Sequence, residues 1–465
     1  MFDSPPNYDA IVIGSGQAGP FLAVRLAKAG LKTLLIEREH LGGTCVNDGC
    51  IPTKTMIASA RTAHMARRAG EFGVVVGEAV RVDLAAVKAR KDRIVAQSID
   101  GLATWIGETN GLDVVFGHAR FVSAHEVEVG GTVLTAPKVF VNVGGRATLP
   151  RWPGIDTVPV LTNTSIMELE VLPEHLIVVG GSYIGLEFAQ MFRRFGSRVT
   201  VLEAADRLVG REDAQVCAGL QAILEHEGIA FHFGVRDARV AMAGSAVRVN
   251  FESGSGAQEL IGSHLLAAVG RRPNTDDLGL ERAGIAVDAR GFIVVDDQLR
   301  TNVDGVWALG DVNGRGAFTH TAYNDYEIVA ANLLDAATRR VSDRIPVYAL
   351  FTDPPLGRIG MSEAEVRATG RPALVAVMPM TRVGRARERG ETQGFMKVLV
   401  DAQTERILGA SLLCIDGDEI VHSLLIAMAA GVSYKVVQQT MHIHPTVGEL
   451  IPTLLGQLAP LTEPA

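Results

Sequence analysis

The chain has 465 residues, of which 47% are hydrophobic, 21% are charged and 50 are glycine. This composition excludes disordered, collagen-like and coiled-coil proteins, and the length predicts a soluble globular protein of about three domains. The net charge of -8, with no long basic run, argues against a nucleic-acid partner.

The N-terminal segment, Met1 to Asp9, lacks the basic region followed by an apolar region that a targeting signal would need. No apolar stretch reaches the roughly 18 residues that a membrane span requires. We therefore expect a cytoplasmic protein with no membrane contact. Four cysteines are too few to staple a chain of this length, so those that matter should act chemically.

The first predicted element is a strand over Tyr8–Ile13, followed by a glycine-rich turn, Gly14–Gly19, and a helix that runs through Lys28. A second strand, Thr33–Ile36, comes next and ends at the acidic residue Glu37. This order of strand, glycine turn, helix, strand and acid is typical of units that bind a dinucleotide at a helix N-terminus.

Each residue of this pattern has a physical reason in a dinucleotide site. Gly14 permits the turn, Gly16 lets the backbone approach a pyrophosphate, and Gly19 lets the helix pack close to the strand. The carboxylate of Glu37 can accept hydrogen bonds from ribose hydroxyls. A single copy of such a turn remains compatible with an ordinary loop between a strand and a helix.

The same pattern returns at a fixed offset of 166 residues, which chance rarely produces: Gly14, Gly19, Gly30 and Glu37 are matched by Gly180, Gly185, Gly196 and Glu203. Leu176–Val179 and Val199–Leu202 are the strands of the second copy. The sequence therefore predicts two Rossmann-like units. In the second unit Ser182 replaces the middle glycine. Its Cβ would crowd the phosphates, so we expect this unit to bind its dinucleotide more weakly or in a slightly displaced position.

Two cysteines, Cys45 and Cys50, lie in the segment GGTCVNDGCIPTK, just ahead of a predicted helix over Thr55–Arg68. They could be metal ligands, inert buried thiols or a reversible disulfide. No second pair of ligands lies nearby, which argues against zinc. Positions five apart on an ideal helix are separated by about 7.5 Å along its axis, so a bond between them must distort the first turn.

Such distortion is consistent with a labile, catalytic disulfide, because strained disulfides are the more easily reduced ones. The positive end of the helix dipole would also favour a thiolate on Cys45 or Cys50.

The segment GGTCVNDGCIPTK resembles that of the flavin disulfide reductases, the class of dihydrolipoamide dehydrogenase, glutathione reductase and mercuric reductase. Recognisable segments of this class run over nearly the whole chain. The resemblance implies an α/β protein with two Rossmann-like domains, binding FAD and NAD(P)H, and an α+β dimerisation domain. The expected bounds are 1–150 and 276–345 for the two parts of the FAD domain, 151–275 for the NAD(P) domain, and 346–465 for the dimerisation domain.

The resemblance also implies roles for single residues. Cys50 would be the sulfur beside the isoalloxazine, and Cys45 the sulfur that exchanges with substrate. Lys54 matches a lysine near flavin N5, and Glu187 looks like its acidic partner. The nucleotide sites would include, for FAD, Gly14, Gly16, Gly19, Glu37, Gly43, Thr44 and Asp311, and, for NAD(P)H, Gly180, Gly185, Glu203 and Gly270.

Further segments are similar to those of the class. Residues 270–275 resemble the end of the NAD(P) domain, and residues 306–312 resemble the second FAD motif, in which Asp311 would bind the ribityl chain. His320 begins a helix that would point at the flavin, and we interpret it as a structural residue. Residues 141–145, Val-Asn-Val-Gly-Gly, depart from the usual Ala-Thr-Gly linker.

The C-terminal third has predicted strands at Arg358–Met361, Gly394–Val400 and Ile407–Leu413, and a helix at Asp418–Ala430. This pattern fits a substrate domain or a subunit interface, and the resemblance favours the interface of a homodimer.

The C-terminal third ends in HPTVGE, residues 444–449, which resembles the signature of the class. There His444 would act as general acid and base from the neighbouring subunit, and Glu449 would fix its tautomer. A histidine suits this role because its ordinary pKa, about 6.5, lies near working pH. His442 and His444 would share a face of a strand, but without further ligands we predict no metal site.

These interpretations predict an oxidoreductase that passes electrons from NAD(P)H through FAD and a Cys45–Cys50 disulfide to a small-molecule disulfide or a metal ion. NADH is favoured because Glu203 suits a ribose 2′-hydroxyl and would repel a 2′-phosphate, although Arg207 lies close by. The wording of residues 180–185 and 442–445 looks closest to mercuric-reductase-like enzymes. The alternatives are dihydrolipoamide dehydrogenase and, in another class, a flavin-containing redox sensor with little turnover.

Overall fold

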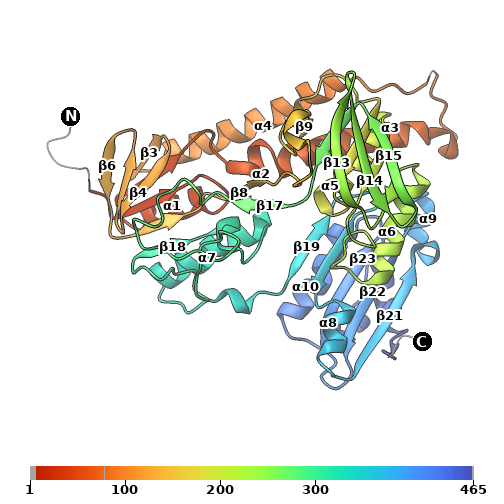
Figure 1. Cartoon of the computed structure of the whole chain (residues 1–465). Coiled ribbons are helices and arrows are strands. Elements are labelled where there is room, and N and C mark those ends of the chain that lie inside the picture. The colour runs from red at the N-terminus through yellow and green to blue at the C-terminus, as the bar shows by residue number, and fades with distance from the viewer. Residues whose placement is uncertain (1–6, 78, 463–465) are drawn as a thin grey trace.

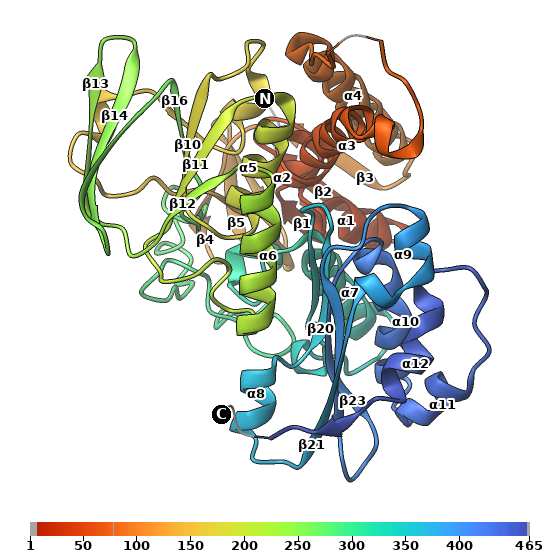
Figure 2. The ribbon, with the colours of Figure 1, turned by 90° about the vertical axis from the view of Figure 1, so that its right-hand side faces the viewer.

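The computed structural model describes residues 7–77 and 79–462, so the first six residues of the N-terminal segment and the last three of the chain lie outside it. It consists of two units that each contain a parallel sheet, and a third unit built on an antiparallel sheet. Figure 1 shows the first unit on the left, the second at the upper right and the third, in blue, below the second. A 90° turn of the molecule shows α6 running down beside the C-terminal sheet (Figure 2).

The first unit is a five-stranded parallel sheet whose strands are short, apolar and mostly buried, as expected where helices cover a parallel sheet. In spatial order its strands are β18 (Val306–Ala308), β7 (Val139–Val141), β1 (Ala10–Ile13), β2 (Thr33–Glu37) and β3 (Leu112–Phe116). Its helices include α1 (Gly19–Lys28) and α7 (Thr319–Leu334). Segments nearly 300 residues apart in the sequence, β1 and β18, thus belong to one sheet.

The second unit repeats this plan. Its parallel sheet has the spatial order β12 (Ala230–His232), β11 (Arg198–Leu202), β10 (His175–Val179), β16 (His264–Ala267) and β9 (Val160–Leu161). The helices are α5 (Tyr183–Phe195) and α6 (Ala214–His226). The strands and helix starts predicted around both glycine turns agree with these elements to within one or two residues. The sequence did not predict where α5 ends.

Each of the two units also carries a three-stranded antiparallel meander. In the first unit it consists of β4 (Ala119–Ser123), β5 (Glu126–Val129) and β6 (Thr132–Thr135); in the second, of β13 (Arg236–Ala243), β14 (Ala246–Ser253) and β15 (Gly256–Gly262). The two chain crossings between the units, β8 (Gly145–Ala147) and β17 (Arg271–Pro273), pair with each other in antiparallel fashion.

The third unit is a six-stranded antiparallel sheet with helices packed against it. Its strands, in spatial order, are β19 (Val347–Leu350), β20 (Leu356–Gly360), β23 (Ile407–Leu413), β22 (Phe395–Asp401), β21 (Ala373–Pro379) and β24 (Ala459–Pro460). Its helices are α8 (Glu363–Ala368), α9 (Gly384–Glu388), α10 (Gly417–Ala429), α11 (Tyr434–Gln439) and α12 (Ile451–Leu455). The three strands and the helix predicted here are present.

The units join through two sets of contacts. Helix α3 (Cys50–Arg67) packs against α4 (Leu84–Gly107) and against α5 of the second unit. One apolar cluster includes residues of α5 and α6 together with Leu356, Phe395 and Leu413 of the C-terminal sheet. In residues 7–77 and 79–462, no helix has the length and apolar character to span a membrane.

Candidate functional site

A cavity of about 1360 Å³ lies where the units meet, and its walls include residues of all three. It brings together most of the residues predicted for the FAD site and the redox pair: Gly14, Gly16, Glu37, Gly43, Thr44, Cys45, Cys50, Lys54, Glu187 and Asp311. Gly180, Gly185, Glu203 and Gly270 of the second nucleotide site, and the pair His444 and Glu449, are not among its lining residues.

The first glycine turn leaves no room for side chains. Gly14 has a φ of +96°, and a Cβ there would lie 2.4 Å from the carbonyl oxygen of Asn142. Gly43, at the start of α2 (Gly43–Asn47), approaches the turn so closely that its Cβ would lie 2.7 Å from the Cα of Gly16. The backbone N–H of Ser15 donates to Glu37 Oε2 at 2.9 Å, so the acid at the end of β2 shapes the turn.

The second glycine turn has the same construction. Gly180 has a φ of +112°, and its Cβ would lie 2.4 Å from the carbonyl oxygen of Ala268. The backbone N–H of Gly181 donates to Glu203 Oε2 at 2.5 Å, and that of Ala205 donates to the other carboxylate oxygen at 2.7 Å. The repeat seen in the sequence therefore extends to a contact between turn and acid. Both turns offer the close backbone approach that a dinucleotide needs.

The two cysteines lie on separate helices, Cys45 on α2 and Cys50 on α3. Helix α2 ends at Asn47, and α3 begins at Cys50, directly after Gly49. A Cβ on Gly49 would lie 2.7 Å from the carbonyl oxygen of Thr44, so this break requires a glycine. The sequence predicted a distorted first turn of one helix, whereas the structure has two helices with a complete break between them. The helix expected from Thr55 begins five residues earlier, at Cys50. Both thiols are free in the structure.

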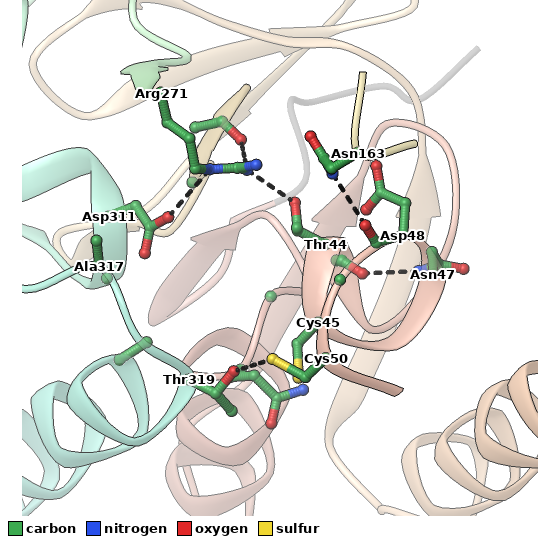
Figure 3. A pocket seen from close by; sticks show the side chains of 18 of the residues that line it. Thr44, Cys45, Asn47, Asp48, Cys50, Asn163, Arg271, Asp311, Ala317 and Thr319 are labelled. Atoms are coloured by element: carbon green, nitrogen blue, oxygen red, sulfur yellow. Dashed lines mark hydrogen bonds and ion pairs between the residues drawn. The ribbon is translucent and has the colours of Figure 1, made fainter. Parts of the chain in front are cut away.

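The two sulfurs differ in their electrostatic surroundings. A hydrogen bond from Cys45, helped by the Thr319 hydroxyl and the charge of Lys54, lowers the pKa of Cys50 to about 6, although burial opposes this shift. The Sγ of Cys50 lies 3.1 Å from the Oγ1 of Thr319 (Figure 3). The hydrogen bond to Cys50, together with burial, raises the pKa of Cys45. At neutral pH the thiolate therefore belongs to Cys50 and the proton to Cys45.

Lys54 and Glu187 form an ion pair beside the sulfurs, with 2.8 Å between Nζ and Oε2. Lys54 comes from α3 and Glu187 from α5, so the pair bridges the first two units. The Glu187 side chain is 8% exposed and also accepts a hydrogen bond from the backbone N–H of Phe351 at 3.0 Å. The lysine ammonium lies 4.5 Å from the centre of the Phe351 ring. These contacts hold a cation at a fixed place in the cavity wall.

Asp311 and Arg271 both line the cavity and lie next to each other (Figure 3). Arg271 Nε lies 3.8 Å from Asp311 Oδ2, and its guanidinium also approaches Thr44 Oγ1 at 3.4 Å and donates to the carbonyl oxygen of Gly145. Burial raises the pKa of Asp311 despite this arginine. Arg271 directly follows Gly270, whose φ is +115°. The sequence pointed to Gly270 but not to the arginine beside it.

His444 and Glu449 lie close together but away from the sulfurs of their own chain. His444 Nδ1 is 2.8 Å from Glu449 Oε2, and the histidine side chain is 81% exposed while the glutamate is 14% exposed. Neither residue lines the cavity. Met441 and Ile443, next to the histidine, are 94% and 79% exposed. A single chain thus presents the histidine on an apolar outer surface.

Some residues around the site were not identified from the sequence. Thr319 lies at the start of a predicted helix, but no role was assigned to it, because the sequence alone does not show which side chain lies next to a sulfur. His320 Nε2 lies 2.7 Å from the carbonyl oxygen of Val347, which fits the structural role expected for it. Within the described residues, no cluster of three or more His, Cys, Asp or Glu side chains could hold a metal ion.

Comparison with known proteins agrees with this geometry. Residues 8–325 match the family model of the pyridine nucleotide-disulphide oxidoreductases, and residues 347–455 match the dimerisation domain of the same family. The chain is 38% identical to the probable pyridine nucleotide-disulfide oxidoreductase RclA of Escherichia coli, over 97% of this chain and 99% of the relative. It is 35% identical to a mercuric reductase of Streptomyces lividans, with 97% and 96% covered.

A dihydrolipoyl dehydrogenase of Cupriavidus necator is 33% identical, with 96% of each chain covered. Among solved structures, the HOCl-induced flavoprotein disulfide reductase RclA from Escherichia coli matches with a TM-score of 0.89 at 37% identity, over 97% of this chain and 99% of that one. A Cu(II) complex of the same reductase matches with a TM-score of 0.88 at 37% identity, over 96% and 99%.

These matches confirm the expected α/β fold, with its nucleotide-binding and dimerisation domains, and the expected activity as an FAD-dependent oxidoreductase. The chain belongs to the pyridine nucleotide-disulfide oxidoreductases and is a flavoprotein disulfide reductase of that family.

Proposed function

We propose that this flavoprotein uses NADH to reduce the Cys45–Cys50 pair, and that the reduced pair delivers two electrons to a thiophilic metal ion or a small disulfide. The observation that carries the proposal is the asymmetric sulfur pair in the cavity wall. Cys50 has a pKa lowered to about 6, and Cys45 keeps its proton. An inert pair of buried cysteines would need neither the neighbouring lysine nor the helix break.

The residues of the cavity fit FAD. A Cβ on Gly14 or Gly43 would collide with the backbone of Asn142 or Gly16, so these glycines allow backbone segments to meet closely in the cavity wall, and the Asp311 carboxylate lines the same cavity. When bound, FAD would supply the two-electron relay between a nicotinamide and the sulfurs. We assign its binding to Gly14, Gly16, Gly19, Glu37, Gly43, Thr44 and Asp311, and that of the nicotinamide dinucleotide to Gly180, Gly185, Glu203 and Gly270.

The two sulfurs would divide the work of disulfide exchange. Cys45 must lose its proton before its sulfur can attack a substrate disulfide, because only a thiolate is a good nucleophile. We assign that proton to His444 of the partner subunit, held by Glu449. The attack forms a mixed disulfide on Cys45 and releases one thiolate, which takes the proton back. The Cys50 thiolate then displaces the second thiolate and closes the Cys45–Cys50 bond.

Reduction of a metal ion would not require a mixed disulfide between Cys45 and the substrate. Oxidation of the Cys45 thiol and the Cys50 thiolate to the Cys45–Cys50 disulfide would release one proton and two electrons, and the two electrons would reduce two Cu(II) ions to Cu(I). Thiolates are soft ligands that prefer such ions. The structural likeness to a reductase solved as a Cu(II) complex supports copper as an acceptor for this chain.

A homodimer would complete the site. The dimerisation domain matched by residues 347–455 contains His444, and Met441 and Ile443 beside it are almost fully exposed. Large apolar side chains on a surface favour a protein partner. Burial of this surface against a second copy would carry His444 to the Cys45 of that copy.

Dihydrolipoyl dehydrogenase activity is the second candidate. The hydrogen-bonding distance of 2.8 Å between His444 Nδ1 and Glu449 Oε2 favours it, because a positioned base serves exchange with an organic dithiol more than it serves metal reduction. This candidate shares the cysteine pair with the first, so the two differ only in the acceptor.

Steady-state oxidation of NADH by the FAD-loaded protein tests the proposal, with lipoamide, glutathione disulfide, Cu(II), Hg(II) and a quinone as acceptors. Cys45→Ser should still allow NADH to reduce the flavin but should abolish turnover with Cu(II) or a disulfide. Unchanged turnover in that variant would rule out the sulfur pair as the electron donor. Preference for lipoamide over the metals would favour the second candidate, and no turnover at all would indicate a redox sensor.

A further inference from the structure

Asn142 lies at the carboxyl end of the central strands of the first sheet. It follows β7, which lies between β1 and β18 in the sheet. Its Oδ1 accepts a hydrogen bond from the backbone N–H of Gly19 at 3.0 Å, and its Nδ2 donates to the carbonyl oxygen of Leu309 at 2.9 Å. The residue is 5% exposed. One buried amide therefore joins the loop after β1 to the loop after β18.

The two loops are shaped around this side chain. A Cβ on Gly16 would lie 3.1 Å from Asn142 Oδ1, and a Cβ on Gly310 would lie 2.9 Å from Asn142 Nδ2. A Cβ on Gly14 would lie 2.4 Å from the Asn142 carbonyl oxygen. Three glycines on two separate loops thus make room for a single residue.

The bridge also decides which backbone amides remain for a ligand. The N–H of Ser15 donates to Glu37, and the N–H of Gly19 is shared between Asn142 Oδ1 and the carbonyl oxygen of Gly16, each at 3.0 Å. Between them, the N–H groups of residues 16–18 donate to no acceptor within the described part of the chain. Gly16 and Gln17 line the cavity. Amides at a helix start are the expected partners of a pyrophosphate.

The second loop carries the other expected contact to FAD. Leu309, which accepts from Asn142, is followed by Gly310 and then by Asp311, whose carboxylate faces the cavity. Backbone hydrogen bonds from Asn142 to Ile13 and from Leu309 to Val141 hold the bases of the two loops, and the two side-chain hydrogen bonds of Asn142 then fix the distance between the amides of residues 16–18 and this carboxylate. Each of those bonds fixes one loop to the end of β7.

We propose that Asn142 is a positioning residue for FAD, which sets the spacing between the pyrophosphate turn and the Asp311 carboxylate. It acts through Gly19 and Leu309 and takes no part in electron transfer. The proposal rests on the flavin site of the proposed function and is independent of the electron acceptor.

The test compares the FAD dissociation constant of apoprotein variants, measured by titration of flavin fluorescence, with the Tm of the same apoproteins. Asn142→Ala removes both hydrogen bonds. Asn142→Asp keeps the shape and the acceptor for Gly19 N–H, but an ionised carboxylate cannot donate to Leu309. Each variant should raise the FAD dissociation constant by about tenfold or more, because the carbonyl oxygen of Leu309 loses its partner on Asn142 and the loops lose their spacing.

Ser197→Ala is the matched control. Ser197 is fully buried in the second unit, and its hydroxyl donates to the carbonyl oxygen of Pro173 at 2.6 Å, far from both FAD loops in the sequence. This variant should lower the Tm of the apoprotein but leave its FAD dissociation constant within about twofold of wild type.

Two results would overturn the proposal. One is an Asn142→Asp protein that folds and binds FAD as tightly as wild type. The other is an Asn142→Ala protein that resembles Ser197→Ala, with a lower Tm and unchanged FAD affinity. Wild-type apoprotein that failed to bind FAD would instead overturn the flavin site of the proposed function, so the two failures are distinguishable.

Discussion

The sulfur of Cys50 lies 3.1 Å from the hydroxyl oxygen of Thr319, which joins two residues 269 positions apart in the sequence. Cys50 is the first residue of α3, and Thr319 is the first residue of α7. Two helix N-termini therefore meet at one sulfur atom. Both present the positive end of a helix dipole, which stabilises a thiolate.

Removal of the hydroxyl should make this thiolate less stable. Thr319→Val keeps the shape of the side chain, and we expect it to move the pKa of Cys50 upward from about 6. The thiolate is lost as pH falls through this pKa, so the variant should lose it at a higher pH than wild type. Ultraviolet absorbance of the thiolate during a pH titration of the reduced protein measures the midpoint.

The control for this titration is Thr62→Val, since Thr62 also lies on α3 but its hydroxyl donates to the carbonyl oxygen of Ala58. It should leave the midpoint unchanged. An identical midpoint in wild type and Thr319→Val would show that the hydroxyl contributes nothing to the thiolate.

Mixed dimers test whether His444 serves the neighbouring subunit. Cys45→Ser and His444→Gln should each lose most activity as homodimers, with a loss of about 100-fold or more for the histidine. In a mixed dimer, the intact Cys45 of one chain can meet the intact His444 of the other. Activity should therefore return when the two inactive proteins are unfolded together and refolded, or coexpressed.

A histidine that acted within its own chain would give a different result. Each chain of the mixed dimer would then hold one defective residue, so the mixture would stay inactive. Separately refolded homodimers, mixed without exchange, are the control and should remain inactive in both cases.

Nicotinamide preference should follow from Glu203. Its carboxylate accepts two backbone hydrogen bonds in the second turn, so its negative charge is held where a 2′-phosphate would be repelled. Wild-type protein should show a kcat/KM at least about tenfold higher for NADH than for NADPH. Glu203→Gln keeps the shape and should narrow that ratio. A wild-type preference for NADPH would contradict this assignment.

Arg194 should be important for the stability of the whole molecule. It is 6% exposed and pairs with Glu227 at 2.7 Å and with Asp353 at 2.6 Å, so it links the second unit to the C-terminal domain. Arg194→Met leaves two carboxylates without their common partner. Removal of one member of a buried ion pair costs about 3–5 kcal/mol, and urea unfolding should show a loss of this size.

The exposed pair of Arg248 and Glu259 provides the comparison. Their side chains are 44% and 50% exposed, with 3.6 Å between Nε and Oε2. Arg248→Met should change the free energy of unfolding by less than about 1 kcal/mol. Equal losses of unfolding free energy in the two arginine variants would show that the buried ion pairs of Arg194 stabilise the protein no more than the exposed pair of Arg248 does.

Features encoded in short stretches of sequence were predictable. The glycine turns need small residues at fixed spacing, so the repeat at an offset of 166 residues locates both turns from the sequence alone. Three of the six strands of the C-terminal sheet, β20, β22 and β23, followed from alternating apolar residues, but β19, β21 and β24 were not predicted. Strand β21 has partly buried positions on both faces, which blurs the alternation.

Contacts between distant segments were not predictable. The helix break at Gly49 depends on the close approach to Thr44, and the surroundings of Cys50 depend on Thr319, which comes from the far end of the same unit. The bridge made by Asn142 depends on the order of three neighbouring strands, which the linker sequence does not contain. The exposure of His444 likewise concerns a surface that a second chain would cover.

The acids Glu37 and Glu203 each accept a hydrogen bond from the residue that follows the first glycine of their turn. These hydrogen bonds fix the curvature of both loops through contacts within the chain, so the entropy of ordering the loops is lost during folding and not during association. Capture of either dinucleotide should then proceed in a single kinetic step, with a rate proportional to ligand concentration and no slow isomerisation afterwards.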